Sequence, residues 1–334
     1  MRGNAISSRR LPYLALILCA GLQQVFAAEA GEEWLYSFQP GDNLWDLTDC
    51  FLIDQSYWNK LVRLNHVKRP RQMPPGTQVR IPLQWLKVEP ASVRVVDVRG
   101  EVFLVRPGEA GHSLGVQARL KHGDLLKIGN DASVLLEFAD GARQLLGSNT
   151  EVELLRINRF SDTGIGDTTI RVLRGKTENM VPTKGTRFEI RTPSANTAVR
   201  GTRFRVKVPE AEQSRSQVEV VVGTVNVTGD AGKLVLAAGF GTVVDKGSAP
   251  APAVRLLPSP SLVAPANTMR RLPLELRWAR VPGAKAYRVL VSHSGENSVP
   301  VMDVQLTHHR FSTSPHRSPI SWFQHFGHRG TWPR

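Results

Sequence analysis

The sequence predicts a multidomain protein: a small α+β module with the order strand, helix, helix, strand, then an all-β sandwich or solenoid, a β-hairpin and a disordered tail. Three observations carry this prediction. Residues 34–83 hold two apolar stripes at helical spacing between two alternating segments. Residues 90–246 hold short β-branched runs separated by Gly and Asp-Gly turns roughly every 8–12 residues. Residues 247–273 contain six of the 22 prolines and predict an extended linker.

The composition excludes several classes of protein. The formal charge is +14, but residues 250–334 alone hold 11 basic and 3 acidic residues, so the surplus does not describe a uniformly basic domain. This distribution argues against a nucleic-acid partner. Two cysteines, Cys19 and Cys50, cannot form a disulfide framework or a Cys-rich metal site. We therefore expect neither a metal nor a cofactor.

The first residues have the pattern of a signal peptide. A basic start precedes an apolar run, Leu11–Leu22, of about 12 residues, whereas a membrane-spanning helix needs roughly 20. Val25-Phe26-Ala27 then suits a signal peptidase. We predict cleavage after residues 1–27, which leaves an exported, soluble, periplasmic protein without a transmembrane anchor.

Residues 34–83 predict each element of the small module. Strands are expected at Trp34–Phe38 and Gln78–Ile81, with turn chemistry at Pro40–Asn43. The two helical stripes are Leu44, Leu47, Phe51, Leu52 and Trp58, Leu61, Val62, Leu64. Because so short a module needs its large side chains for a core, we expect these four residues to be buried: Trp45, Leu47, Trp58 and Leu61.

These residues resemble a LysM module. The resemblance rests on Tyr36-x-Phe38-x-Pro40-Gly41-Asp42-Asn43-Leu44-Trp45, on Leu64-Asn65 and on Met73-x-Pro75-Gly76-Thr77-x-Val79-x-Ile81-Pro82. LysM modules bind N-acetylglucosamine-containing glycans such as peptidoglycan in a shallow groove between two loops. The resemblance implies that Leu44 and Met73 cover the apolar face of the sugar, and that the groove is lined by Gly41, Asp42, Asn43, Leu44, Met73, Pro74 and Pro75.

Residues 90–246 alternate between strands and turns. Asp140-Gly141, between Val134–Phe138 and Ala142–Leu146, predicts a hairpin. Gly185–Arg191 recurs as Gly201–Lys207, and in both copies the apolar residues alternate with charged ones. This alternation predicts strands with one buried face, and it places Arg203, Arg205 and Lys207 in a basic stripe on the solvent face. The stripe is either a charged surface that keeps the sheet soluble or a binding stripe for phosphate or an anionic polymer.

The same segment resembles a FecR domain. The resemblance rests on His122–Gly129, Leu136–Ala142, Leu173–Gly175, Arg191–Ala195, Val199–Phe204, Gly223–Val227 and Leu236–Gly239. It implies a periplasmic all-β module with sensing, scaffolding or protein-interaction roles rather than chemistry. FecR-type signal transducers carry a cytoplasmic segment and a membrane helix ahead of this domain. This sequence has neither, so we do not expect direct control of a sigma factor.

The last quarter predicts a hairpin and a tail. Leu274–Trp278 and Tyr287–Val291 alternate as two strands around Val281-Pro-Gly-Ala284. They resemble the opening of a fibronectin type III-like domain, of which residues 274–306 would be only a part. Residues 307–334 hold five of the nine histidines and no clear periodicity. We expect a disordered tail here, as in a truncated or out-of-frame product.

The sequence contains no catalytic motif such as Gly-x-Ser-x-Gly, a phosphate-binding glycine loop or a His-x-x-x-His helix. We therefore expect no enzyme, but a periplasmic peptidoglycan-binding protein whose FecR-like domain is a scaffold or interaction module. Two alternatives stay open. One is a periplasmic signalling adaptor that recognises an envelope protein through the FecR-like domain. The other is an envelope polyanion binder that uses the basic stripe.

Overall fold

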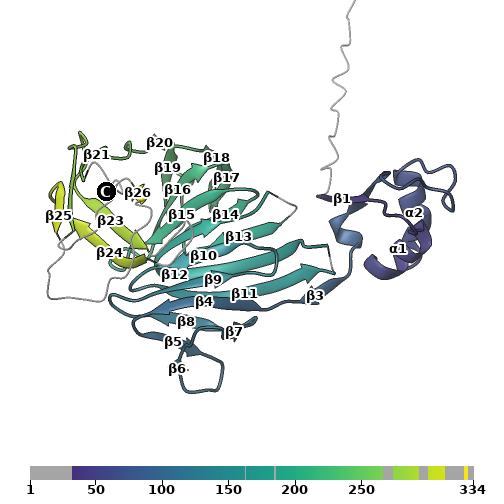
Figure 1. Cartoon of the computed structure of the whole chain (residues 1–334), viewed down its shortest axis with the longest axis horizontal. Helices are drawn as coiled ribbons and strands as arrows, with labels where there is room; N and C mark the ends of the chain where they lie inside the picture. Colours follow the sequence, from purple (N-terminus) through teal and green to yellow (C-terminus); the bar gives the residue numbers. More distant parts are fainter. Residues whose placement is uncertain are drawn as a thin grey trace, which may run out of the picture. The chain divides into compact units, whose positions relative to one another are not determined.

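The computed structural model describes residues 32–161, 163–183, 186–265, 274–292, 300–312 and 327–329 (Figure 1). The signal peptide predicted over residues 1–27 lies outside these ranges. Within them, no helix combines the length and the apolar character needed to cross a bilayer.

The N-terminal head, residues 33–82, has the order strand, helix, helix, strand. Strand β1 (Glu33–Ser37) pairs antiparallel with β2 (Gln78–Pro82), and helices α1 (Leu44–Phe51) and α2 (Tyr57–Leu64) lie between them in the chain. Asn43 caps α1, because its side-chain oxygen accepts a hydrogen bond from the backbone N–H of Asp46 at 2.8 Å. Asn65 joins the end of α2 to β2 through hydrogen bonds to the backbone N–H and C=O of Arg80 at 2.7 and 2.9 Å.

One expected core residue of the head is exposed. Leu44, Leu47 and Leu61 are buried, but Trp45 is 56% exposed and meets Trp58 edge-on, with ring centroids 6.1 Å apart. Trp45 follows Leu44 by one residue and so lies off the buried stripe of α1. The head does not need Trp45 in its core, because that core also includes residues from outside the module: Leu86, Phe160 and Ile165.

The β domain contains strands β3 to β20, whose pairings form one closed network (Figure 1). The strands form two sheets that enclose the core, and we call them sheet I and sheet II. Sheet I has the order β6-β5-β8-β11-β12-β13-β14-β17-β18. Sheet II has the order β7-β4-β9-β10-β12-β15-β16-β19-β20. The pairing of β12 with β13 is parallel.

The strands of sheet I are β5 (Val102–Val105), β6 (His112–Ser113), β8 (Leu125–Ile128), β11 (Glu151–Phe160), β12 (Gly166–Met180), β13 (Arg187–Arg191), β14 (Asn196–Val199), β17 (Thr224–Gly229) and β18 (Gly232–Ala237). Sheet II shares β12 and adds β4 (Val93–Arg99), β7 (Arg119–Leu120), β9 (Ser133–Glu137), β10 (Arg143–Leu146), β15 (Arg203–Val208), β16 (Arg215–Val222), β19 (Phe240–Asp245) and β20 (Val254–Arg255). Strand β3 (Val88–Pro90) pairs with the end of β11, and a single 3-10 turn (Leu83–Trp85) precedes it.

Strand β12 belongs to both sheets. Its first part pairs with β11 and β13 in sheet I, and its second part pairs with β10 and β15 in sheet II. The change occurs at Gly175, which has a φ of +94°. A Cβ at this position would overlap Thr150, so the crossing requires glycine.

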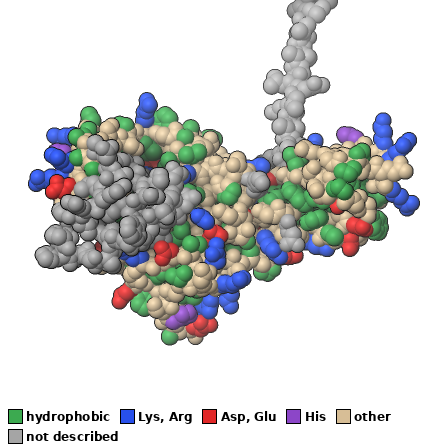
Figure 2. Space-filling model, viewed as in Figure 1, with side chains coloured by type: hydrophobic (Ala, Val, Ile, Leu, Met, Phe, Trp, Pro, Cys, Tyr) green, Lys and Arg blue, Asp and Glu red, His purple; other side chains and the backbone are tan. Residues whose placement is uncertain are grey.

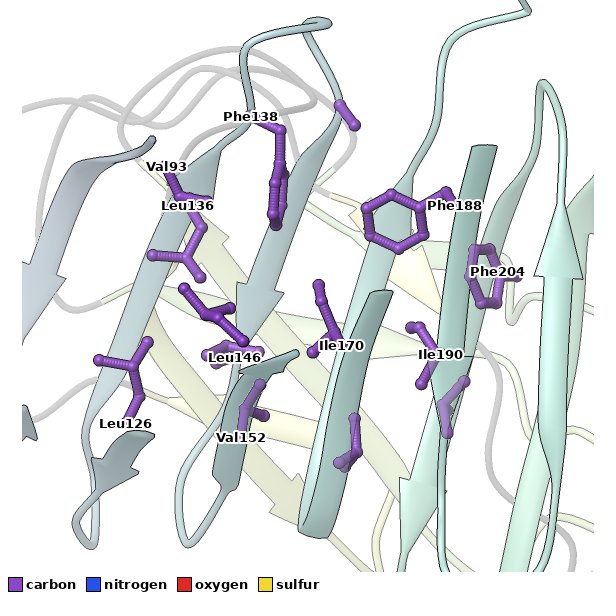
Figure 3. Packing of buried hydrophobic residues seen from close by; sticks show 14 of the residues in the cluster. Val93, Leu126, Leu136, Phe138, Leu146, Val152, Ile170, Phe188, Ile190 and Phe204 are labelled. Atoms are coloured by element: carbon purple, nitrogen blue, oxygen red, sulfur yellow. The ribbon is translucent and has the colours of Figure 1, made fainter. Parts of the chain in front are cut away.

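The core lies between the two sheets (Figure 3). The two copies of the internal repeat lie in different sheets, on β13 and β15, and both direct their apolar residues inward: Phe188 and Ile190 from one, Phe204 and Val206 from the other. The hairpin predicted at Asp140-Gly141 is present, since β9 pairs with β10 and Gly141 has a φ of +82°.

The C-terminal module consists of two small sheets. One contains β21 (Leu262–Ala264), β22 (Glu275–Trp278) and β25 (Arg310–Ser312), and the other contains β24 (Pro300–Leu306), β23 (Tyr287–Ser292) and β26 (Gly327–Arg329). Strands β20 and β21 fall in the expected linker, and β25 and β26 fall in the expected tail, so neither range is wholly irregular. Residues 313–326 and 330–334 of the tail lie outside the described ranges.

The expected hairpin of residues 274–278 and 287–291 is wrong. Strand β22 pairs with β21 and β25, while β23 pairs with β24 and β26. The apolar faces of β22 and β23 pack into one cluster that includes Leu276, Trp278, Tyr287 and Val289. Placing the two strands in facing sheets lets each apolar face cover the other, which a lone hairpin cannot do.

Candidate functional site

Hydrogen bonds join the segments that flank the two head loops predicted to bind glycan. The C=O of Phe38, ahead of the first loop, accepts a hydrogen bond from the N–H of Gly76 at 2.7 Å, and the N–H of Phe38 donates to the C=O of Thr77 at 2.9 Å. Gly41 and Gly76 have φ values of +94° and +85°, which suit glycine at both turns. The structure therefore joins the start of the first loop, at Phe38, to the end of the second loop, at Gly76 and Thr77.

The polar side chains of the first loop hold the loop itself. Asp42 accepts hydrogen bonds from the Tyr36 hydroxyl and from the N–H of Gln39, both at 2.6 Å. Burial of Tyr36, together with the Asp42 carboxylate, raises the pKa of Tyr36 to about 12. Asn43 is engaged as the cap of α1.

The apolar contacts expected of this site differ from the prediction. Leu44 is 0% exposed, so its side chain has no surface to offer a sugar. Met73 is half-buried and packs against the head core. Exposed surface at the two loops comes from Gly41, Pro74 and Pro75.

The basic stripe on β15 is not a solvated surface. Arg205 is only 6% exposed and lies 3.0 Å from Glu219 and 3.8 Å from Glu178. Burial lowers the pKa of Lys207, which lies beside Lys176, and Arg203 is half-buried. The alternation correctly directs these residues away from the core, but a second layer covers that face.

The covering layer is the C-terminal module. Arg288 on β23 pairs with Glu178 at 2.6 Å and with both oxygens of Asp303 on β24 at 2.7 and 2.6 Å. Lys176 on β12 reaches Asp303 at 3.0 Å. We call Lys176, Glu178, Arg205, Glu219, Arg288 and Asp303 the interface ion network. Its alternating signs leave the outer face of sheet II unsuited to a polyanion. On the face of the molecule that Figure 2 shows, Lys and Arg side chains are scattered, with Asp and Glu among them.

A cleft lies on the outer face of sheet I where the sheet is interrupted. Strand β11 pairs with β8 at Glu151–Glu153 and with β3 at Asn158–Phe160, and its pairing with β12 shifts register between Leu154 and Arg156. A β-bulge of this kind redirects side chains and often lies near functional sites. The β11 cleft has a volume of about 470 Å³ and is lined by His122, Leu155, Arg156, Ile157, Asn158, Thr169 and Arg191.

The β11 cleft is supported by hydrogen bonds and ion pairs. His122 Nδ1 lies 2.7 Å from the C=O of the bulged residue Leu155. Arg156 donates to the Thr169 hydroxyl at 2.7 Å and lies 3.4 Å from Asp167. Burial raises the pKa of Asp167, and Arg156 opposes this shift.

Glu189 joins the two arginines of the cleft. Arg191 pairs with both oxygens of Glu189 at 2.9 and 3.1 Å, and Arg156 lies 3.6 Å from the same carboxylate. Sequence reasoning missed this cleft, because a bulge and a change of strand neighbour leave no pattern of period two. Its lining residues come from β11, β12, β13 and the turn before β8.

The described residues contain no group of three or more His, Cys, Asp or Glu that could hold a metal ion.

Comparison with known proteins identifies one domain. Residues 124–226 match the family model described as FecR protein, so the chain carries a FecR domain at these residues. This range lies inside the β domain and covers β8 to β16 completely. A comparison with curated proteins finds no matching sequence.

Two solved structures resemble part of the chain. Both are crystal structures of a candidate anti-sigma factor from Parabacteroides distasonis, with 20% and 18% sequence identity and TM-scores of 0.33 and 0.32. Each alignment covers 39% of this chain and 59% of the other chain. The present chain therefore spans less than two thirds of the proteins to which it is similar.

Proposed function

We propose that this protein is an exported, non-enzymatic periplasmic adaptor whose FecR domain recognises an envelope protein. The observation that carries the proposal is the FecR match at residues 124–226, because the resemblance implies sensing, scaffolding or protein interaction. Regulation through protein contact needs an accessible surface rather than a catalytic site.

The arrangement of the two sheets indicates which face of the β domain is accessible to this partner. The C-terminal module occupies the outer face of sheet II through the interface ion network. The outer face of sheet I carries the β11 cleft and, farther along, the exposed residues Asn196, Ala198 and Asn226 on β14 and β17. We therefore assign partner recognition to sheet I.

Site-specific photo-crosslinking of the full chain in cells tests this proposal. A crosslinking amino acid at Asn226 should form an adduct with an envelope protein, and the same amino acid at Asn59, exposed on α2 of the head, should not form that adduct. Absence of any protein adduct from Asn226 and from Asn196 would refute the adaptor.

A second candidate function is retention at peptidoglycan by the head. The observation that favours it is the order β1, α1, α2, β2, with Phe38 ahead of the first predicted loop hydrogen-bonded to Gly76 and Thr77 after the second. A few net hydrogen bonds of about 1 kcal/mol each give a weak site, on the order of millimolar to tens of micromolar for one sugar. Contact with several sugars along a glycan strand would strengthen retention.

Sedimentation with purified peptidoglycan tests the head. The full chain should pellet, and Asp42→Ala, which removes the support of the first loop, should reduce the pelleted fraction while Asn59→Ala leaves it unchanged. Binding through neutral groups should change little between low and high salt. A wild-type chain that stays in the supernatant would rule out this function.

A further inference from the structure

The β11 cleft has the features of a recognition site, and packing of the core does not require it. It lies at the stretch of β11 between its pairings with β8 and β3, where the edge of residues 154–157 that does not pair with β12 faces a turn. His122 from that turn satisfies the carbonyl of Leu155, so the bulge is stabilised without closing the cleft. Arg156 and Arg191 remain 43% and 44% exposed, so both are accessible to a ligand.

The two arginines present hydrogen-bond donors in a fixed geometry. Both guanidinium groups lie within 3.6 Å of the same oxygen of Glu189. Arg191 uses its Nε and one Nη for Glu189. Arg156 uses its Nε and one Nη for Thr169, and its other Nη lies 3.4 Å from Asp167. A guanidinium has five N–H groups, so each arginine keeps donors for a further acceptor.

The charged residues of the cleft indicate which class of acceptor it can bind. Asp167 and Glu189 balance Arg156 and Arg191, so the cleft lacks the net positive field that attracts a phosphate-rich polymer. What it offers is directional: N–H groups that can donate to the oxygens of a carboxylate, beside the half-buried side chain of Leu155. This combination suits an acidic side chain on a peptide.

We propose that the β11 cleft binds a carboxylate side chain in an acidic peptide segment of the envelope partner. This inference rests on the proposed adaptor function and names the site and the chemistry of recognition. Arg156 and Arg191 bind the carboxylate, and Asp167, Glu189 and Thr169 hold the two guanidinium groups in position.

Titration of the full chain with two matched peptides tests the proposal. The probes are an acetylated, amidated hexapeptide with a single Asp among Ser and Gly residues and its Asn counterpart, and binding is followed by the amide and arginine Nε signals in NMR spectra. The acidic peptide should shift the signals of residues 155–158 and 191, and the neutral peptide should bind at least tenfold more weakly. Equal binding of the two peptides, or no shift with either, would overturn the inference.

Variants separate recognition from general attraction. Arg191→Gln should weaken acidic-peptide binding about tenfold, as expected for one charge-assisted hydrogen bond. Arg171→Gln is the matched control, because Arg171 lies on the same sheet face, is 46% exposed and pairs with Glu153 outside the cleft. Arg156→Lys keeps the charge but loses the planar set of N–H donors, so it should also weaken binding. This variant tests the site independently if Arg191→Gln lowers the stability of the protein. An equal effect of Arg171→Gln would mean attraction to the whole surface and would refute the site.

The two proposals fail in different ways. A crosslinked protein adduct at Asn226 without peptide binding in the cleft would refute the cleft and leave the adaptor intact. Peptide binding at residues 155–158 without any protein adduct in cells would refute the adaptor.

Discussion

Replacement of Arg288 by methionine should undock the C-terminal module from sheet II. The guanidinium lies between Glu178 and Asp303, and the three side chains are only 12%, 12% and 17% exposed. Methionine keeps much of the apolar stem and removes the charge. Two buried carboxylates then lose their main partner.

The size of the effect follows from the remaining partners. Removing one member of a buried ion pair typically costs about 3–5 kcal/mol. Lys176 stays 3.0 Å from Asp303, and Arg205 stays 3.8 Å from Glu178, so we expect a loss near the lower limit, about 3 kcal/mol.

Denaturant unfolding of the full chain measures this loss in a double-mutant cycle. Combining Arg288→Met with Asp303→Asn removes the unpaired charge at Asp303, so the two effects should be non-additive by about 1–3 kcal/mol. Arg277→Met, exposed on β22, is the control and should change stability by less than about 0.5 kcal/mol. A loss below about 1 kcal/mol for Arg288→Met, with additive effects in the double variant, would refute the reasoning.

Three further predictions follow from burial, backbone geometry and titration. Gly175→Ala should lower the unfolding free energy by about 3 kcal/mol, because a positive φ and overlap with Thr150 both oppose a Cβ; Gly123→Ala, with a φ of +85° and open space, should cost only about 1 kcal/mol. Burial raises the pKa of Asp303, but Arg288 and Lys176 lower it overall, so its stabilisation is present above pH ~4 and is lost as the pH falls through the lower folded value; Asp303→Asn should flatten the acid limb of a stability–pH curve. Leu44→Ala should cost about 2–5 kcal/mol by circular dichroism, whereas exposed Trp45→Ala should cost less than about 1 kcal/mol; equal losses would contradict the observed face of α1.

Much of the β domain follows from local sequence pattern. The period-two alternation around Phe188 and Phe204 predicts both strands and their inward faces, because one buried face fixes the register of a strand. Asp140-Gly141 predicts its hairpin because glycine supplies the positive φ of the turn. The FecR resemblance is confirmed at residues 124–226.

Features that depend on a second layer could not be predicted. Alternation directs Arg205 away from the core, but it carries no information about the C-terminal module, whose Arg288 pairs with Glu178 beside Arg205. The same limit applies to β22 and β23, whose apolar faces match each other across two sheets instead of along one hairpin. Trp45 is exposed although it is expected in the core, because residues after the module, such as Leu86, complete the head core.

The β11 cleft is a further case of this limit. The cleft depends on the position in β11 at which its pairing changes from β8 to β3. His122 and Arg191, which line the cleft, come from segments that are far apart in the sequence. Of the predicted glycan residues, the sequence places Asp42 and Asn43 correctly in one loop, but both side chains are used to hold that loop.

From β8 onward, the strand order in each sheet follows the chain order, so every new strand joins one that already exists. The domain can therefore assemble progressively, from its amino end, while later residues are still emerging from the ribosome or a narrow export channel. The same geometry lets evolution extend or shorten the structure by whole strand pairs at its far end, without rewiring what came before.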